Sequence, residues 1–179
     1  MIKITKPLVS FDLETTGTDI SKDKVIQLAT SKIFLDGTVE RKKVYINPMM
    51  VIPEESIKIH GITNEMLEGC KPFSSYANSL HDYMYDCDFS GFNIEDFDIP
   101  MLAEEFARCK LTFPNPDSKI IDVYKLERIV NSHKLGHTYK RYTEKDLENA
   151  HDAMSDVDAS DVVLECITLK NNIEFSVEA

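Results

Sequence analysis

The first residues in this chain that could do chemistry are two acids, Asp12 and Glu14, in the segment LVSFDLE. The apolar run over residues 8–14 predicts a buried strand, and side chains two apart on a strand project from the same face. Two carboxylates about 4 Å apart repel by about 4 kcal/mol at an effective dielectric constant near 20. A bound divalent cation removes that repulsion, and hard oxygen ligands suit Mg²⁺ or Mn²⁺. The pair predicts a metal site at a strand end, and capping of nearby backbone is the alternative interpretation.

A second acidic segment, GFNIEDFDIP, begins at Gly91 and contains Asp96 and Asp98. Residues 97–109 show the apolar spacing of a helix, with Pro100 in the first turn, where proline is tolerated. Asp96 fits an N-cap or a solvent-exposed acid, and Asp98 fits the opening residue of the helix. The local pattern leaves both acids open as site residues.

The third segment reads HDAMSD and runs from His151 to Asp156, where the last long helix begins, predicted over 153–169. Positions five apart on a helix differ by about 140°, so these two residues cannot share one helical face. If both reach one site, His151 must lie on the loop or cap before the helix. Asp156 is predicted to fall in an apolar stripe, whereas Asp158 and Asp161 fall on the opposite, solvated face. The stripe contains Ala153, Ser160, Val163, Leu164 and Ile167. An acid in such a stripe needs a partner, and a metal ion is one.

Together, FDLETTG, GFNIEDFDIP and HDAMSD occur in the order of the three motifs of the DnaQ-like 3′→5′ exonuclease family, DEDDh type. The chain resembles that family, which includes the proofreading epsilon subunit of bacterial DNA polymerase III, over roughly residues 7–170. The resemblance favours Asp98 over Asp96, because Phe-Asp is the family pattern. Three residues separate Asn93 from Phe97 here, whereas some members have two.

The resemblance implies that Asp12, Glu14, Asp98 and Asp156 hold two Mg²⁺ (or Mn²⁺) ions. Asp12 would bridge both ions, Glu14 and Asp156 would serve the ion that holds the attacking water, and Asp98 would serve the other. Such a pair of ions clamps the attacking and leaving oxygens of a phosphodiester. His151 would take the proton from the water, for which an unperturbed pKa of about 6.5 is suitable. The product would be a nucleoside 5′-monophosphate.

Three further residues are implied contacts to the terminal nucleotide: Thr15 and Thr16, which follow the first motif, and His60 in Ile-His-Gly-Ile-Thr. A turn histidine held by backbone is the alternative interpretation of His60. Asp122 fits a helix N-cap and is interpreted as structural.

The elements that must position these residues are strands first and alternating strands and helices afterwards. Strands are predicted at 8–14, 24–34 and 39–47, with a hairpin signal at Asp36-Gly37. This order predicts an α/β domain with a mixed sheet. The resemblance implies an RNase H-like fold, with a five-stranded mixed sheet and helices on both faces. We expect one domain over residues 1–170 and a short tail over 171–179.

Composition narrows the function classes. The net charge of −11 argues against a protein that coats nucleic acid nonspecifically, but it is compatible with an enzyme that binds divalent cations. No run of 18 apolar residues and no signal core occur, so a cytoplasmic protein without a membrane span is expected. The four cysteines lack CxxC spacing and are predicted to be reduced, mostly buried thiols.

The function expected from these features is 3′→5′ hydrolysis of single-stranded DNA or frayed 3′ ends, of the DNA proofreading or repair type. Its partners would be nucleic-acid 3′ ends and a polymerase or repair protein. One alternative is an exoribonuclease that trims short RNA or tRNA ends. Another is a non-catalytic nucleic-acid-binding or polymerase-associated module, which a missing motif acid would favour. No motif acid is missing from this sequence.

Overall fold

The computed structural model of the 179-residue chain describes residues 4–131, 133–148 and 153–171. The chain divides into two compact units, residues 1–126 and residues 127–179. The single domain predicted over 1–170 stays a prediction, as does the tail, of which residues 172–179 lie outside the described ranges.

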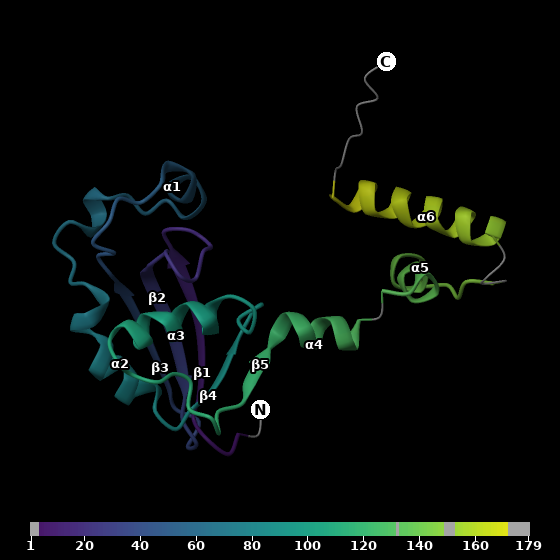
Figure 1. Ribbon diagram of the computed structural model, residues 1–179. Coiled ribbons are helices and arrows are strands. Elements are labelled where there is room, and N and C mark those ends of the chain that lie inside the picture. The colour runs from purple at the N-terminus through teal and green to yellow at the C-terminus, as the bar shows by residue number, and fades with distance from the viewer. Residues whose placement is uncertain (1–3, 132, 149–152, 172–179) are drawn as a thin grey trace. The chain divides into compact units, whose positions relative to one another are not determined.

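The first unit is built on a five-stranded mixed sheet, with strand order β3-β2-β1-β4-β5 (Figure 1). The strands are β1 Leu8–Thr15, β2 Val25–Ile33, β3 Val39–Tyr45, β4 Asp88–Gly91 and β5 Ile120–Asp122. β2 runs antiparallel to β1 and β3, whereas β4 runs parallel to β1 and β5. The predicted α/β class and five-stranded mixed sheet are confirmed, and β1 with its two acids is the central strand.

Short helices connect the strands of this unit. They are α1 Glu54–His60, α2 Ala77–Met84 and α3 Asp98–Arg108, with 3-10 turns at Glu65–Leu67 and Phe73–Ser75. The helices predicted over 73–85 and 97–109 are therefore present, the first of them interrupted after its opening turn. Pro100 lies in the first turn of α3, as expected.

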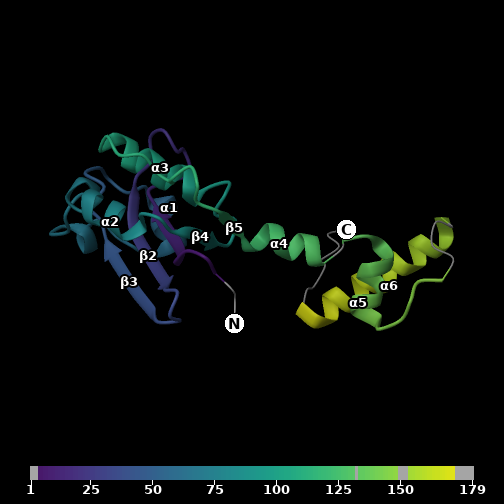
Figure 2. The ribbon, with the colours of Figure 1, turned by 90° about the horizontal axis from the view of Figure 1, so that it is seen from below.

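The core of the first unit lies between one face of the sheet and helices α2 and α3. In the middle of β1 the buried Val9, Phe11 and Leu13 alternate with the partly or fully exposed Ser10, Asp12 and Glu14. Alternation along a strand therefore places the acids on the face opposite the core. α3 lies along the sheet in both views (Figures 1 and 2) and contributes a buried apolar stripe. That stripe consists of Ile99, Met101, Leu102 and Phe106.

The second unit contains two helices that pack against each other, α5 Leu135–Thr143 and α6 Ala153–Asn171. The boundary between the units falls within α4, Val123–Val130. The predicted apolar stripe of α6 is only partly correct. Val163 is buried as expected, but Ala159 is its buried neighbour, while Ser160 and Leu164 are exposed. The buried side of α6 thus runs through Ala159 and Val163, one helical turn apart, and α6 packs against α5.

The composition led to expectations about the cysteines and about membrane-spanning helices. All four cysteines, Cys70, Cys87, Cys109 and Cys166, are free thiols, and Cys87 is buried while the others are half-buried. Across the described ranges, no helix combines the length and the apolar character that crossing a membrane requires.

Candidate functional site

The first two motifs meet at β1. Asp98 opens α3 and is 6 % exposed, and its Oδ1 accepts a hydrogen bond of 3.1 Å from the backbone N–H of Leu13. The two residues are 85 positions apart in the chain, and Leu13 lies between Asp12 and Glu14. The N-terminus of α3 therefore brings a carboxylate from the second motif to the strand that carries the first.

The carboxyl groups of Asp98 and Asp12 influence each other electrostatically. Burial raises the pKa of Asp98 to about 6, and the negative charge of Asp12 adds to this effect. Although Asp12 is exposed on the sheet surface, partial desolvation of its carboxyl also raises its pKa. Glu14 is half-buried and, by strand alternation, lies on the same face as Asp12. The arrangement gathers negative charge where a cation would relieve the repulsion.

Asp96, the competing acid of the second motif, lies elsewhere. Its side chain is 62 % exposed and pairs with the ammonium group of Lys125 at 3.0 Å. The same Lys125 Nζ also pairs with Glu95 at 2.7 Å. Asp96 is therefore a surface acid, as its alternative interpretation held, and its ion pair is with Lys125 of α4.

Asp122 holds the loop of the second motif. Its buried carboxylate accepts four backbone N–H groups, from Asn93 at 3.2 Å, Glu95 at 3.1 Å, Tyr124 at 2.9 Å and Lys125 at 3.1 Å. Burial would raise the pKa of Asp122, but the four hydrogen bonds outweigh it and lower the pKa. The predicted helix-capping role is confirmed. The bonds to Asn93 and Glu95 add a role that the sequence did not reveal, since they fix the loop that leads into Asp98.

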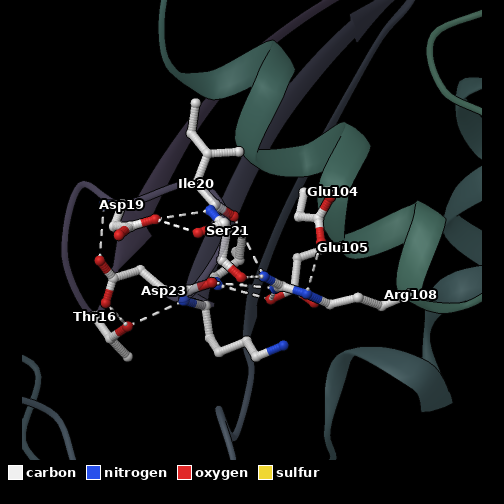
Figure 3. Close-up of polar contacts among 10 residues, drawn as sticks. Thr16, Asp19, Ile20, Ser21, Asp23, Glu104, Glu105 and Arg108 are labelled. Atoms are coloured by element: carbon white, nitrogen blue, oxygen red, sulfur yellow. Dashed lines mark hydrogen bonds and ion pairs between the residues drawn. The ribbon is translucent and has the colours of Figure 1, made fainter.

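The loop after the first motif is tied internally by hydroxyl and carboxylate groups (Figure 3). Thr16 Oγ1 donates to Asp23 Oδ1 at 2.8 Å and accepts from Lys24 N–H at 3.0 Å. Thr15 Oγ1 donates to the carbonyl of Gly17 at 2.7 Å. Both threonine side chains thus stabilise the loop, and their predicted contact with a nucleotide stays a prediction.

Arg108, in the last turn of α3, clamps the same loop to the helix (Figure 3). Its guanidinium donates to the carbonyls of Asp23 at 3.1 Å, Ser21 at 2.9 Å and Ile20 at 3.3 Å. It also pairs with the buried Glu105 at 3.4 Å. α3 therefore contacts β1 through Asp98 in its first turn and the loop after β1 through Arg108 in its last turn. This clamp was not predicted from the sequence, although Glu105, an acid at a core-facing position of α3, is a signal for it.

His60 ends α1 beside the left-handed Gly61. Its Nδ1 accepts from the backbone N–H of Ile62 at 3.0 Å, as expected of a turn histidine. Its Nε2 is buried and has no hydrogen-bond partner among the described residues. Ser56 of the same helix donates to the carbonyl of Thr16 at 2.7 Å, which ties α1 to the loop after the first motif. His60 thus carries a polar atom that a ligand could satisfy.

The third motif is described only in part. His151 lies outside the described residues, and Asp156 is a half-buried residue of α6 in the second unit. Asp158 and Asp161 are exposed on α6, as predicted. The described side chains include no group of three or more His, Cys, Asp or Glu residues that could hold a metal ion. The structure therefore brings Asp98 to the strand that carries Asp12 and Glu14, and it describes Asp156 separately, in the second unit.

Comparison with known proteins decides the family. A family model described as Exonuclease (RNase_T) matches residues 9–163, which covers all three motifs and extends into the second unit. The chain belongs to the DnaQ-like exonuclease family. A relative, 3′-5′ exonuclease DinG of Bacillus subtilis, is 34 % identical over 145 residues, or 80 % of this chain. A PolC-type DNA polymerase III of Streptococcus pyogenes is 29 % identical over 156 residues, or 85 % of this chain.

The chain spans only part of the length of these relatives, 15 % of DinG and 10 % of PolC. The crystal structure of E. coli exonuclease I with a dT13 oligonucleotide matches 92 % of this chain and 41 % of that protein. The TM-score is 0.64 at 20 % sequence identity, which confirms the predicted RNase H-like fold. The exonuclease family generally uses divalent metal ions, and exonuclease I of E. coli has also been crystallised with zinc bound.

Proposed function

We propose that this chain is a metal-dependent 3′→5′ exonuclease that hydrolyses phosphodiester bonds from the 3′ end and releases nucleoside 5′-monophosphates. The observation that carries the proposal is the position of Asp98. A carboxylate from the second motif is buried against β1, next to Asp12 and with a raised pKa. If Asp98 served only to cap α3, it would not need to lie beside a second carboxylate, that of Asp12.

The proposed metal ligands are Asp12, Glu14, Asp98 and Asp156, which would hold two Mg²⁺ or Mn²⁺ ions. The residues fit this role, because all four donors are hard carboxylate oxygens and two of them repel each other in the metal-free protein. When bound, such ions stabilise the charge on the attacking and leaving oxygens of the phosphodiester. His151 is the proposed general base that accepts the proton of the attacking water.

The surrounding residues would hold the terminal nucleotide. The Leu13 N–H engages Oδ1 of Asp98, which orients the carboxylate and leaves Oδ2 available as a ligand. The unpartnered Nε2 of His60 is suited to a hydrogen bond with a sugar hydroxyl or a phosphate oxygen. Thr15 and Thr16 lie on the loop that Ser56 ties to α1, and they are proposed to line the same pocket.

Single-stranded DNA or frayed 3′ ends are the proposed substrate, and a polymerase or repair protein is the proposed partner. The PolC-type relatives support a polymerase partner, and the dT13 complex of exonuclease I supports a single-stranded DNA substrate. A cytoplasmic location is part of the same proposal, because the enzyme must reach DNA.

The test is digestion of matched 5′-fluorescein DNA and RNA 12-mers in Mg²⁺, in Mn²⁺ and in EDTA. We expect stepwise release of 5′-monophosphates from DNA in either metal and none in EDTA. Asp12→Ala and Asp98→Asn should each lower the rate by at least about 100-fold, because each removes charge at the reacting centre. Asp96→Asn is the matched control, since that acid lies two positions away and is exposed, and its ion pair is with Lys125.

Three results would count against the proposal. Wild-type protein that releases no nucleotide from either substrate in either metal would refute the activity. Faster digestion of RNA than of DNA would refute DNA as the proposed substrate. An Asp96→Asn variant as impaired as Asp98→Asn would refute the assignment of the second motif.

A further inference from the structure

β3 carries three consecutive cations, Arg41, Lys42 and Lys43, and all three are exposed. They stand out in a chain with a net charge of −11. β3 is an edge strand, because it pairs with β2 alone in the sheet order β3-β2-β1-β4-β5. Exposed positive charge at a sheet edge discourages strand pairing, and it also attracts a polyanion.

The strand register places two of these cations on the face that carries Asp12. Asp12 pairs with Ala29, and Ala29 pairs with Lys43, so the three side chains form one row across β1, β2 and β3. Ser31 and Arg41 continue the neighbouring row. Residues directly opposite in antiparallel strands share a face, and two strand spacings amount to about 10 Å. Within the first unit, β2 contributes the small residues Ala29 and Ser31 to the two rows between the acid and the cations.

Lys42 projects to the other face, where it pairs with Thr30 across the strands. Its ammonium lies 4.0 Å from the ring centroid of Tyr83 and forms an ion pair of 3.0 Å with Glu40. The β3 cations also border a cavity of about 520 Å³ between the sheet and α2. No acidic residue lines this cavity, whose walls are Leu28, Thr30, Arg41, Lys42, Lys43, Val44, Tyr76, Ser79, Leu80 and Tyr83. The positive surface thus continues around the edge.

Arg41 and Lys43 are the cations left for a ligand. In the described part of the chain, no carboxylate forms an ion pair with either residue. Lys43 instead lies 5.4 Å from the ring centroid of Tyr45, its neighbour on the same face. An unpaired guanidinium and an unpaired ammonium side by side are the groups that bind successive phosphates.

We propose that β3 is a phosphate-binding edge for single-stranded nucleic acid, with Arg41 and Lys43 holding the phosphates a short distance behind the 3′ end. The assignment of the 3′ end to Asp12 and Asp98 rests on the proposed function, but binding to β3 does not require hydrolysis. Within the first unit, the nucleic-acid strand would cross β2 along the rows of Ala29 and Ser31. This site would hold the substrate while its terminal nucleotide is removed, in a protein whose overall charge repels DNA.

The experiment measures binding of 5′-fluorescein-dT12 to the full chain by fluorescence anisotropy in EDTA, at 25–200 mM NaCl. The double variant Arg41→Gln/Lys43→Gln removes two phosphate contacts, each of which adds about 0.7 to the salt slope for a single strand. We expect the slope of log K against log[salt] to become less steep by about 1.4, and the affinity at 0.1 M salt to fall about 25-fold. The control, Lys71→Gln/Lys110→Gln, removes the same charge from exposed positions and should leave binding within twofold.

Equal weakening by both double variants would overturn the proposal, because it would reduce the effect to net charge. So would unchanged binding in Arg41→Gln/Lys43→Gln. A Glu-rich peptide of equal charge is tested in the same assay. If it binds as tightly as dT12, the ligand of β3 is an acidic protein segment and the proposed nucleic-acid ligand is refuted. Nucleotide release from dT12 in Mg²⁺ is measured in parallel. If the wild type binds dT12 but releases no nucleotide, the proposed function is refuted and the β3 site stands. If the wild type releases nucleotides and Arg41→Gln/Lys43→Gln binds dT12 as tightly as the wild type, the β3 site is refuted.

Discussion

Replacing Asp98 by asparagine is expected to stabilise the metal-free protein at neutral pH. The amide oxygen can still accept the 3.1 Å hydrogen bond from the Leu13 N–H, so the change removes charge and keeps the geometry. At neutral pH the wild-type carboxylate is ionised, buried and close to Asp12, and this raises its pKa from 3.8 to about 6. The charge that helps to bind a cation therefore costs stability when no cation is present.

The size and sign follow from proton linkage. A carboxyl whose pKa is raised on folding contributes stability that is complete below its unfolded pKa of 3.8 and is lost as the pH rises through about 6. At about 1.4 kcal/mol for each pH unit between the two values, the loss is at most about 3 kcal/mol. The Asp98→Asn variant does not titrate at this position. It should therefore exceed the wild type in free energy of unfolding by about 1–3 kcal/mol at pH 7.5.

Urea unfolding followed by far-UV circular dichroism in EDTA, at pH 7.5 and pH 4.0, would measure the difference. At pH 4.0 the advantage of the variant should largely disappear, because the wild-type carboxyl is protonated in the folded state and half-protonated when unfolded. Addition of Mg²⁺ at pH 7.5 should raise the free energy of unfolding of the wild type more than that of the variant, because a ligand stabilises the folded form that binds it. The control Asp96→Asn, at an exposed ion pair, should change stability by less than about 0.5 kcal/mol at either pH. A variant that is less stable than the wild type at pH 7.5 in EDTA would refute the reasoning.

Three further changes test the framework of the site. Asp122→Ala leaves four backbone N–H groups without their acceptor and should lower the free energy of unfolding by at least about 2 kcal/mol in urea; a loss under 0.5 kcal/mol would contradict this. Gly91→Ala should cost about 1–3 kcal/mol in the same assay, because its Cβ would lie 2.0 Å from Cγ2 of Ile94, and an unchanged midpoint would show that the loop yields freely. Arg108→Met removes three hydrogen bonds to loop carbonyls, so trypsin should cut after Lys22 faster than in the wild type, as measured by mass spectrometry; an equal rate would mean that the loop does not depend on the clamp.

The sequence by itself determined the features that depend on local spacing. Two-residue alternation in β1 places Asp12 and Glu14 on one face, because successive side chains of a strand point to opposite sides. The helices that begin at Asp98 and Ala153, and the capping role of Asp122, follow from patterns within about ten residues. The ordered set of motifs also identified the family, which a match over residues 9–163 confirms.

Only the tertiary structure decided which distant groups meet. The spacing of Asp96 and Asp98 did not show which acid lies at β1, and the answer is a hydrogen bond between residues 85 positions apart. The clamp of Arg108 on the loop after the first motif and the row from Asp12 to Lys43 are likewise contacts and registers between separate segments. Local periodicity records which face a side chain occupies. It does not record what packs against that face, because that partner is selected by the burial of the whole core.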